Sequence, residues 1–279
     1  KEVRAYRDLF PEFKLPSPGC YFADCDEKRQ QGIVIIDDLV TLSATFCHPQ
    51  TPQSYQLVAD RLTVLARFHA QSWDSPELRA GGRWSWAHDY LAASQTYMKR
   101  YLEPNVWHHY VTSPRGAAAS VHFHKAEWMG SALDLLPRFA RDLPRCLIHG
   151  DTHLGNLYIE HDGTPGFFDP QPMQAPAMVE VTYHIACALD PLDRRRWERA
   201  LVQHYLEALH SQGVEAPDLD TAMRQYSVFL VPGYCIFLVN ASDFQPEAIN
   251  TAYTARFSAA MIDNNTLETL EAVRHEISV

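Results

Sequence analysis

Two stretches decide the fold: Leu147-Ile148-His149-Gly150-Asp151-Thr152-His153-Leu154-Gly155-Asn156 and Gly166-Phe167-Phe168-Asp169. The chain leaves the first stretch through the apolar run Leu157-Tyr158-Ile159, and turn-forming residues follow at 161–166 before Phe167. Two short apolar runs separated by turn residues are typical of a β-hairpin. We therefore predict a hairpin that carries Asn156 at one base and Asp169 beside it at the other.

The spacing of these polar residues suits phosphoryl transfer. That reaction needs a carboxylate to accept or orient the proton of the attacking hydroxyl, and further oxygen ligands to hold Mg²⁺ at the phosphates. The pattern His149-x-Asp151-x-x-x-x-Asn156 has the spacing of a protein-kinase catalytic loop, with Gly150 in place of arginine. We predict that Asp151 is the catalytic group and that Asn156 and Asp169 are the metal ligands.

The pattern H-G-D-x-H-x-x-N followed by D-x-Q resembles the aminoglycoside phosphotransferase and choline kinase superfamily. Gln171, after Asp169, is most similar to the ecdysteroid-kinase-like (CHK-kinase-like) branch. The resemblance implies an α+β, bilobal, protein-kinase-like fold, with a small β-containing lobe at residues 1–38 and a large, mainly helical lobe at residues 39–279. It also implies ATP and Mg²⁺ as cofactors, and a small-molecule hydroxyl as the phosphate acceptor.

The same resemblance suggests further cofactor-binding residues. Glu2 matches a helix glutamate that pairs with a lysine further upstream, so the small lobe is expected to be truncated here; the alternative is an exposed first-turn acid. Asp37-Asp38-Leu39 resembles the hinge whose backbone binds adenine, although it could equally be an ordinary strand end. The resemblance also suggests His149 as a cofactor-binding residue. Glu180 stands where the family usually has an aspartate that braces the catalytic loop, and its extra methylene puts that brace in question.

Two other functions remain open from the sequence. Pro170 and Glu180 depart from the family pattern and leave room for a nucleotide-binding pseudokinase. His149, Asp151 and His153 would share one face of a strand and could bind a metal, as in a metal-dependent hydrolase. The hydrolase alternative leaves Asn156 and the Asp169 hairpin unused.

Composition limits the partners. The 279 residues carry a formal net charge of −10, which argues against a general nucleic-acid surface. The most apolar stretch, residues 226–241, is interrupted by Pro232-Gly233, so we predict a buried, kinked helix and no membrane span. The six cysteines form no C-x-x-C pair, so we expect free thiols and a cytoplasmic location. The oligomeric state stays open.

Periodicity predicts the remaining elements. The first helix should end at Pro11, and His69 should be a core residue on a helix spanning residues 52–73. Strands are expected at 19–24 and, buried, at 32–36, with a polar turn at 26–31 between them. Further helices are expected at 87–103, 125–140, 178 onward, 190–210, 218–241 and 246–273, the last interrupted near residue 264. Residues 107–116 and 170–176 should be irregular.

Aromatic residues suggest the acceptor. We expect three segments, 81–86, 105–110 and 226–244, to line its pocket. They hold Trp84, Trp86, Trp107, Tyr110, Tyr234 and Phe237, and one acid, Asp243. Walls of this kind favour a small apolar alcohol over a polycation. The alternative is that these rings are core residues, which is the better interpretation for Tyr234 and Phe237.

Overall fold

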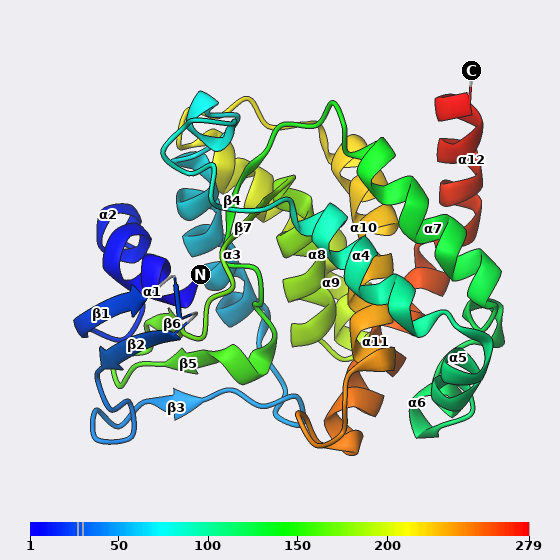
Figure 1. Ribbon diagram of the computed structural model, residues 1–279, viewed down its shortest axis with the longest axis horizontal. Coiled ribbons are helices and arrows are strands. Elements are labelled where there is room, and N and C mark those ends of the chain that lie inside the picture. Colours follow the sequence, from blue (N-terminus) through cyan, green and yellow to red (C-terminus); the bar gives the residue numbers. More distant parts are fainter. Residues whose placement is uncertain (27, 30, 279) are drawn as a thin grey trace.

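The computed structural model describes residues 1–26, 28–29 and 31–278, and its fold is α+β and bilobal. Short strands and the N-terminal helices lie on one side, and the long helices form the other (Figure 1). Strand β4 (Cys146–Ile148) and strand β7 (Met173–Ala175) lie between these two parts. We keep the boundary between residues 38 and 39 as a proposal.

The N-terminal helix continues past Pro11, so the predicted end was wrong. It consists of α1 (Glu2–Arg4), a π-helical segment (Ala5–Leu9) and α2 (Phe10–Phe13). Pro11 falls in the first turn of α2, where a residue without an N–H is tolerated. The helix ends where Lys14 takes the left-handed conformation, with φ 51°.

Strands β1 (Cys20–Asp26) and β2 (Gln31–Ile36) form the predicted antiparallel pair, with Phe22 opposite Ile35. The expected polar turn between them includes residues 27 and 30, which lie outside the described residues. The prediction that β2 is buried was wrong, because Ile33 and Ile35 are 52% and 48% exposed. One face of this two-stranded sheet packs on the N-terminal helix, and the other face is open.

The hairpin after Asn156 is confirmed. Strand β5 (Leu157–Ile159) pairs antiparallel with β6 (Pro165–Phe167), and β3 (Thr45–Phe46) pairs with the other edge of β5. Strand β4 pairs antiparallel with β7, so the segment 170–176 contains a strand that the sequence did not predict. This second pair brings the chain before His149 next to the chain after Asp169.

Among the described residues, the larger part of the chain contains ten α-helices: α3 (Tyr55–Ala70), α4 (Tyr90–Met98), α5 (Pro104–Val111), α6 (Pro114–Ala117), α7 (Ala126–Phe139), α8 (Ala177–Ala188), α9 (Pro191–His210), α10 (Leu219–Val239), α11 (Glu247–Asp263) and α12 (Thr266–Ser278). Helices α5 and α6 occupy a region expected to be irregular. Pro104 and Pro114 each begin one of them, because proline is well suited to the first helical position.

Helix α10 is the centre of the helical core and packs against α7, α8, α9, α11 and α12. It is the one helix among the described residues long and apolar enough to span a membrane, but 83% of its apolar window is buried inside the protein. It is therefore the predicted core helix. His69 of α3 is a core residue, as predicted, and it shares a fully buried face with Val58, Leu62 and Leu65.

Candidate active site

The loop of residues 149–156 begins with a sharp change of direction at Gly150. Gly150 has φ +87°, and a Cβ atom there would lie 2.1 Å from the carbonyl oxygen of Gln171. Only glycine fits both requirements without strain. The backbone N–H of Gln171 also donates to the carbonyl of His149 at 2.8 Å. The segment before Asp151 and the segment after Asp169 are therefore held together at Gly150 and Gln171.

Asp151 is partly exposed and hydrogen-bonded through both carboxylate oxygens. Its Oδ1 accepts from the Tyr183 hydroxyl at 3.0 Å, and its Oδ2 accepts from Asn156 Nδ2 at 3.0 Å. Burial, followed by the charge of Asp151, raises the pKa of Tyr183 well above its ordinary value, so Tyr183 stays a hydrogen-bond donor. The sequence did not single out Tyr183, although it lies three residues after Glu180 and therefore on the same face of α8.

Asn156 has one fixed orientation. Its Nδ2 donates both to the main-chain oxygen of Asp151 and to Asp151 Oδ2, each at 3.0 Å. Because both hydrogens of the amide are engaged, the Oδ1 atom is the end that is left to bind something else. Asn156 is 6% exposed, so this free oxygen sits at the base of the site rather than on the outer surface.

Asp169 lies beside Asn156, as predicted, because the N–H of the preceding Phe168 donates to the carbonyl of Asn156 at 3.1 Å. Asp169 has φ 52°, a left-handed conformation that is uncommon for residues other than glycine. Its side chain is exposed. Strained backbone of this kind is concentrated at functional sites.

Glu2 reaches the same site from the N-terminal helix. Burial raises the pKa of its carboxyl group, and the nearby charge of Asp169 raises it further. The two carboxylates therefore face the same region, where a cation would relieve their repulsion.

Glu180 braces the loop. Its Oε2 accepts from the N–H of His149 at 3.0 Å, and its Oε1 accepts from the N–H of Gly150 at 2.7 Å. Oε2 also lies 3.0 Å from Nε2 of His69, whose Nδ1 is hydrogen-bonded to the Tyr205 hydroxyl at 2.8 Å. Glutamate therefore reaches the backbone that we expected an aspartate to bind. His69 is a core residue, as predicted, but it also supports this brace.

His149 was predicted to bind cofactor, but its side chain lies in the core. It is fully buried, and its ring stacks on Phe10 and lies against Phe167. It also does not converge with Asp151 and His153 on one point. Among residues 1–26, 28–29 and 31–278, no group of three His, Cys, Asp or Glu side chains is arranged to hold a metal ion. The geometry thus gives the hydrolase alternative no ligand cluster.

Asp37 and Leu39 of the predicted hinge line a cleft of about 540 Å³, together with Tyr158 of β5. The side chains of the two acids are used within the chain. Asp37 accepts from the N–H of Gly19 at 2.8 Å, and Asp38 accepts from the N–H of Val40 at 3.0 Å. Backbone groups at this edge are used as well: the Asp37 N–H donates to the Gly19 carbonyl at 2.9 Å, and the Asp38 and Leu39 carbonyls accept from the N–H groups of Leu42 and Ala44. The hinge stays a prediction.

The predicted aromatic pocket does not form as one cavity. Trp84 is 7% exposed and packs edge-on against Phe13, so it is a core residue, which was the alternative interpretation. Trp107, Tyr234 and Phe237 are also buried in the core, as expected for the last two. Of the four, Phe237 lies nearest the site, because its ring stacks on Tyr183 at a centroid distance of 5.7 Å.

Fold and site together define a small-molecule kinase-like phosphotransferase. A family model described as the phosphotransferase enzyme family matches residues 33–219, and the chain belongs to this family. This confirms the superfamily resemblance, whereas the ecdysteroid-kinase-like branch stays a prediction. No curated protein matches the sequence.

Solved structures show the same fold. Choline kinase LicA from Streptococcus pneumoniae is 10% identical, with a TM-score of 0.56 over 97% of this chain and 80% of that one. A choline/ethanolamine kinase family protein from Mesorhizobium loti is 15% identical, with a TM-score of 0.56 over 98% and 82%. Spectinomycin phosphotransferase, solved with ADP and its antibiotic, is 13% identical, with a TM-score of 0.51 over 98% and 82%.

Proposed function

We propose that the protein transfers the γ-phosphoryl group of ATP to a hydroxyl group of a small molecule. The observation that carries this proposal is the fixed orientation of Asn156. Asp151 takes both amide hydrogens, so the Asn156 oxygen points away from the carboxylate that would receive a proton. One side of the loop thus presents a base, and the other presents a metal ligand.

Asn156 and Asp169 suit Mg²⁺ because they offer an amide oxygen and an exposed carboxylate, the hard oxygen ligands that this ion prefers. Bound there, Mg²⁺ would neutralise charge on the transferring phosphates. Glu2 faces the same region. The adenine would lie in the cleft lined by Asp37, Leu39 and Tyr158.

Asp151 would act on the acceptor. Its oxygen takes the proton of the acceptor hydroxyl while the hydroxyl oxygen forms a bond to the γ-phosphorus. The bond between that phosphorus and the bridging oxygen of ADP breaks, and ADP leaves with the electron pair. Tyr183 and Asn156 hold the carboxylate in place, so that the acceptor meets a prepared base.

The acceptor is proposed to be a small, largely apolar alcohol. Support comes from aromatic rings near Asp151: Tyr183, which donates to its carboxylate, stacks on Phe237, and His153 lies edge-on to Phe237 with 6.2 Å between centroids. Rings of this kind suit the apolar part of an acceptor. They would also suit a quaternary ammonium group, so choline is the competing acceptor to test.

The test measures Mg²⁺-dependent ATP consumption with steroid-like alcohols, acyl alcohols, choline and kanamycin-like aminoglycosides, each added alone. Turnover of an apolar alcohol supports the full proposal. Turnover of an aminoglycoside alone rejects the acceptor class and keeps the reaction. ATP binding without consumption under every condition would instead identify a pseudokinase.

All six cysteines are free, which supports the proposed cytoplasmic location.

A further inference from the structure

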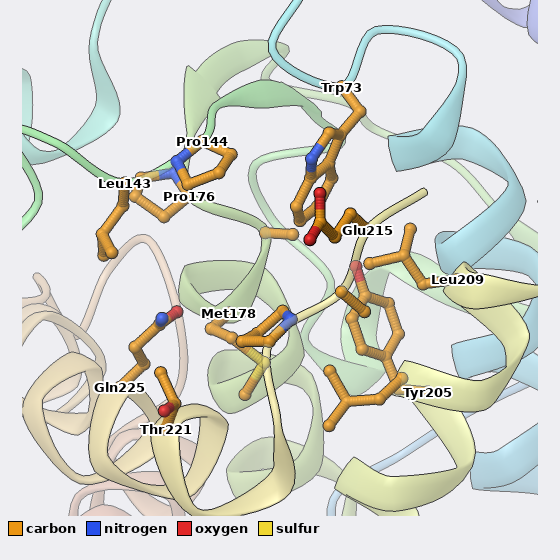
Figure 2. A pocket seen from close by; sticks show the side chains of 14 residues that line it. Trp73, Leu143, Pro144, Pro176, Met178, Tyr205, Leu209, Glu215, Thr221 and Gln225 are labelled. Carbon is orange, nitrogen blue, oxygen red and sulfur yellow. The ribbon is translucent and has the colours of Figure 1, made fainter. Parts of the chain in front are cut away.

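A second cavity, of about 300 Å³, lies among the helices and shares no lining residue with the cleft at Asp37. The start of α8, one face of α9 and the first turns of α10 surround it, and Trp73, Pro144 and the segment 215–217 complete it (Figure 2). The side chains facing it are mainly apolar, including Leu143, Met178 and Leu209. A cavity of this size can take a small organic molecule.

Gln225 is the unusual residue in this cavity. It is 7% exposed, and its amide forms no hydrogen bond with any of the residues that the structure describes. Figure 2 shows the amide pointing into the cavity. The neighbouring Thr221 hydroxyl is already bonded to Asp218. The amide atoms remain accessible from the cavity and have no partner within the described residues, so this group is placed to bind a polar atom of a molecule that enters the cavity.

Glu215 supplies a charge on the other side of the cavity. Glu215 and Trp73 both line the cavity, and Figure 2 shows Glu215 on the side away from Gln225. Glu215 is exposed and forms no ion pair among the described residues. The complementary molecule therefore carries a cationic group at one end, an apolar body, and a hydroxyl or amide group at the other end.

The cavity also touches the brace of the 149–156 loop. Tyr205 lines it and is hydrogen-bonded to His69, which contacts Glu180. Ala177 and Met178, at the start of α8, line it as well, and Glu180 follows them on the same helix. A molecule that fills the cavity would hold both the helix start and the tyrosine in place.

We propose that this cavity is a second binding site, for a small amphipathic amine, and that its occupancy stabilises the 149–156 loop through Tyr205, His69 and Glu180. The site goes beyond the proposed phosphoryl transfer, and its binding test does not depend on that activity.

The binding test uses three probes in calorimetry: tyramine, phenethylamine, which lacks the hydroxyl, and 4-ethylphenol, which lacks the amine. Gln225→Met should weaken tyramine about tenfold and leave phenethylamine unchanged, because it removes one buried hydrogen bond. Glu215→Gln should weaken both amines and leave 4-ethylphenol unchanged. Glu207→Gln, on an exposed part of α9, is the matched control. Ala216→Trp should fill the cavity and abolish binding of all three.

Two results would overturn the site: no binding of any probe at millimolar concentration, or equal tyramine affinity in Gln225→Met and the unmodified protein. The link to the loop is tested by amide hydrogen exchange. With tyramine at ten times its Kd, exchange at Gly150 should slow by up to about elevenfold, if the opening also releases the ligand. Tyr205→Phe should keep tyramine binding and lose most of this protection. Unchanged exchange at Gly150 with tyramine bound would refute the link.

Discussion

Glu180 accepts the backbone N–H of Gly150 at 2.7 Å, and this contact joins helix α8 to the loop that presents Asp151. The carboxylate is buried, which alone would raise its pKa, but the hydrogen bond from His69 and the loop N–H groups bring the net shift below the ordinary value. Glu180 therefore stays charged in the core. A charged, fully bonded brace fixes the loop before any substrate arrives.

Asp151→Asn should reduce phosphoryl transfer by roughly 10²-fold or more, because it removes the proposed base while keeping the size of the side chain. The asparagine oxygen can accept from Tyr183 or from Asn156 but not from both, so the melting temperature should fall modestly while the protein stays folded. ATP consumption with the best acceptor measures the effect. Asp162→Asn, at an exposed turn, is the control. Turnover near that of the unmodified protein would reject the assignment of Asp151.

Asp169→Asn should weaken Mg²⁺-dependent nucleotide binding by about tenfold or more, since a full charge on a hard-cation ligand is lost. Asparagine tolerates the left-handed conformation at this position, so the backbone should not change. Asn156→Ala should have a smaller effect on affinity. Calorimetry with and without Mg²⁺ separates the metal-dependent part of the nucleotide affinity from the metal-independent part. An unchanged Mg²⁺ dependence in Asp169→Asn would show that Asp169 is not a metal ligand.

The sequence predicted the parts of the site that depend on local spacing. Asp151, Asn156 and Asp169 sit on one loop and one hairpin, so their separation along the chain nearly determines their separation in space. The brace could not be found in this way, because His69 and Glu180 are 111 positions apart and meet only through tertiary packing. Strand β7 was missed for a similar reason, since its proline-rich surroundings indicate a loop unless the pairing with β4 is known.

Two other predictions, for the strand at 32–36 and for Trp84, were wrong for a different reason. The run Ile33-Val34-Ile35-Ile36 is typical of a buried strand, but burial depends on what covers the second face of the sheet. Trp84 was predicted to line the acceptor pocket, yet its ring packs on Phe13 of the N-terminal helix. Local sequence carries no information about such partners.

Stability should fall as the pH is lowered from about 6.5 towards 4. Burial lowers the pKa of His184 from 6.5 to about 4, and burial also lowers the pKa of His149. The folded-state pKa lies below the unfolded one, so the unfolded chain binds protons first as the pH falls, and the contribution present above pH 6.5 is progressively lost. For His184 the full loss is about 3 kcal/mol.

Urea unfolding at pH 7 and pH 5 measures this dependence. His184→Asn should flatten this pH dependence, because asparagine does not titrate. The fold should be kept, since asparagine can still donate to the carbonyl of Thr152, which His184 Nδ1 contacts at 3.1 Å. His161→Asn, on the exposed turn, should leave the slope unchanged. An equally steep slope in His184→Asn would show that other groups cause the pH dependence.

Gly150→Ala should destabilise the protein more than Gly163→Ala, although the two glycines have similar backbones, with φ +87° and φ +91°. Both substitutions carry the cost of a left-handed alanine, about 1–2 kcal/mol. Only at Gly150 does the added Cβ meet another atom, the Gln171 oxygen at 2.1 Å, whereas Gly163 has open space. The difference between the two free energies of unfolding therefore isolates the clash, which should add about 1–3 kcal/mol.

The same pair separates stability from function. To relieve the clash, Gly150→Ala must move either Gln171, next to the Asp169 segment, or the N–H that Glu180 accepts. Its ATP turnover should therefore fall at a temperature where both variants remain folded, while Gly163→Ala keeps normal turnover. Equal unfolding free energies and equal turnover in the two variants would mean that the loop can relax away from Gln171, and that the close approach does not position Asp151.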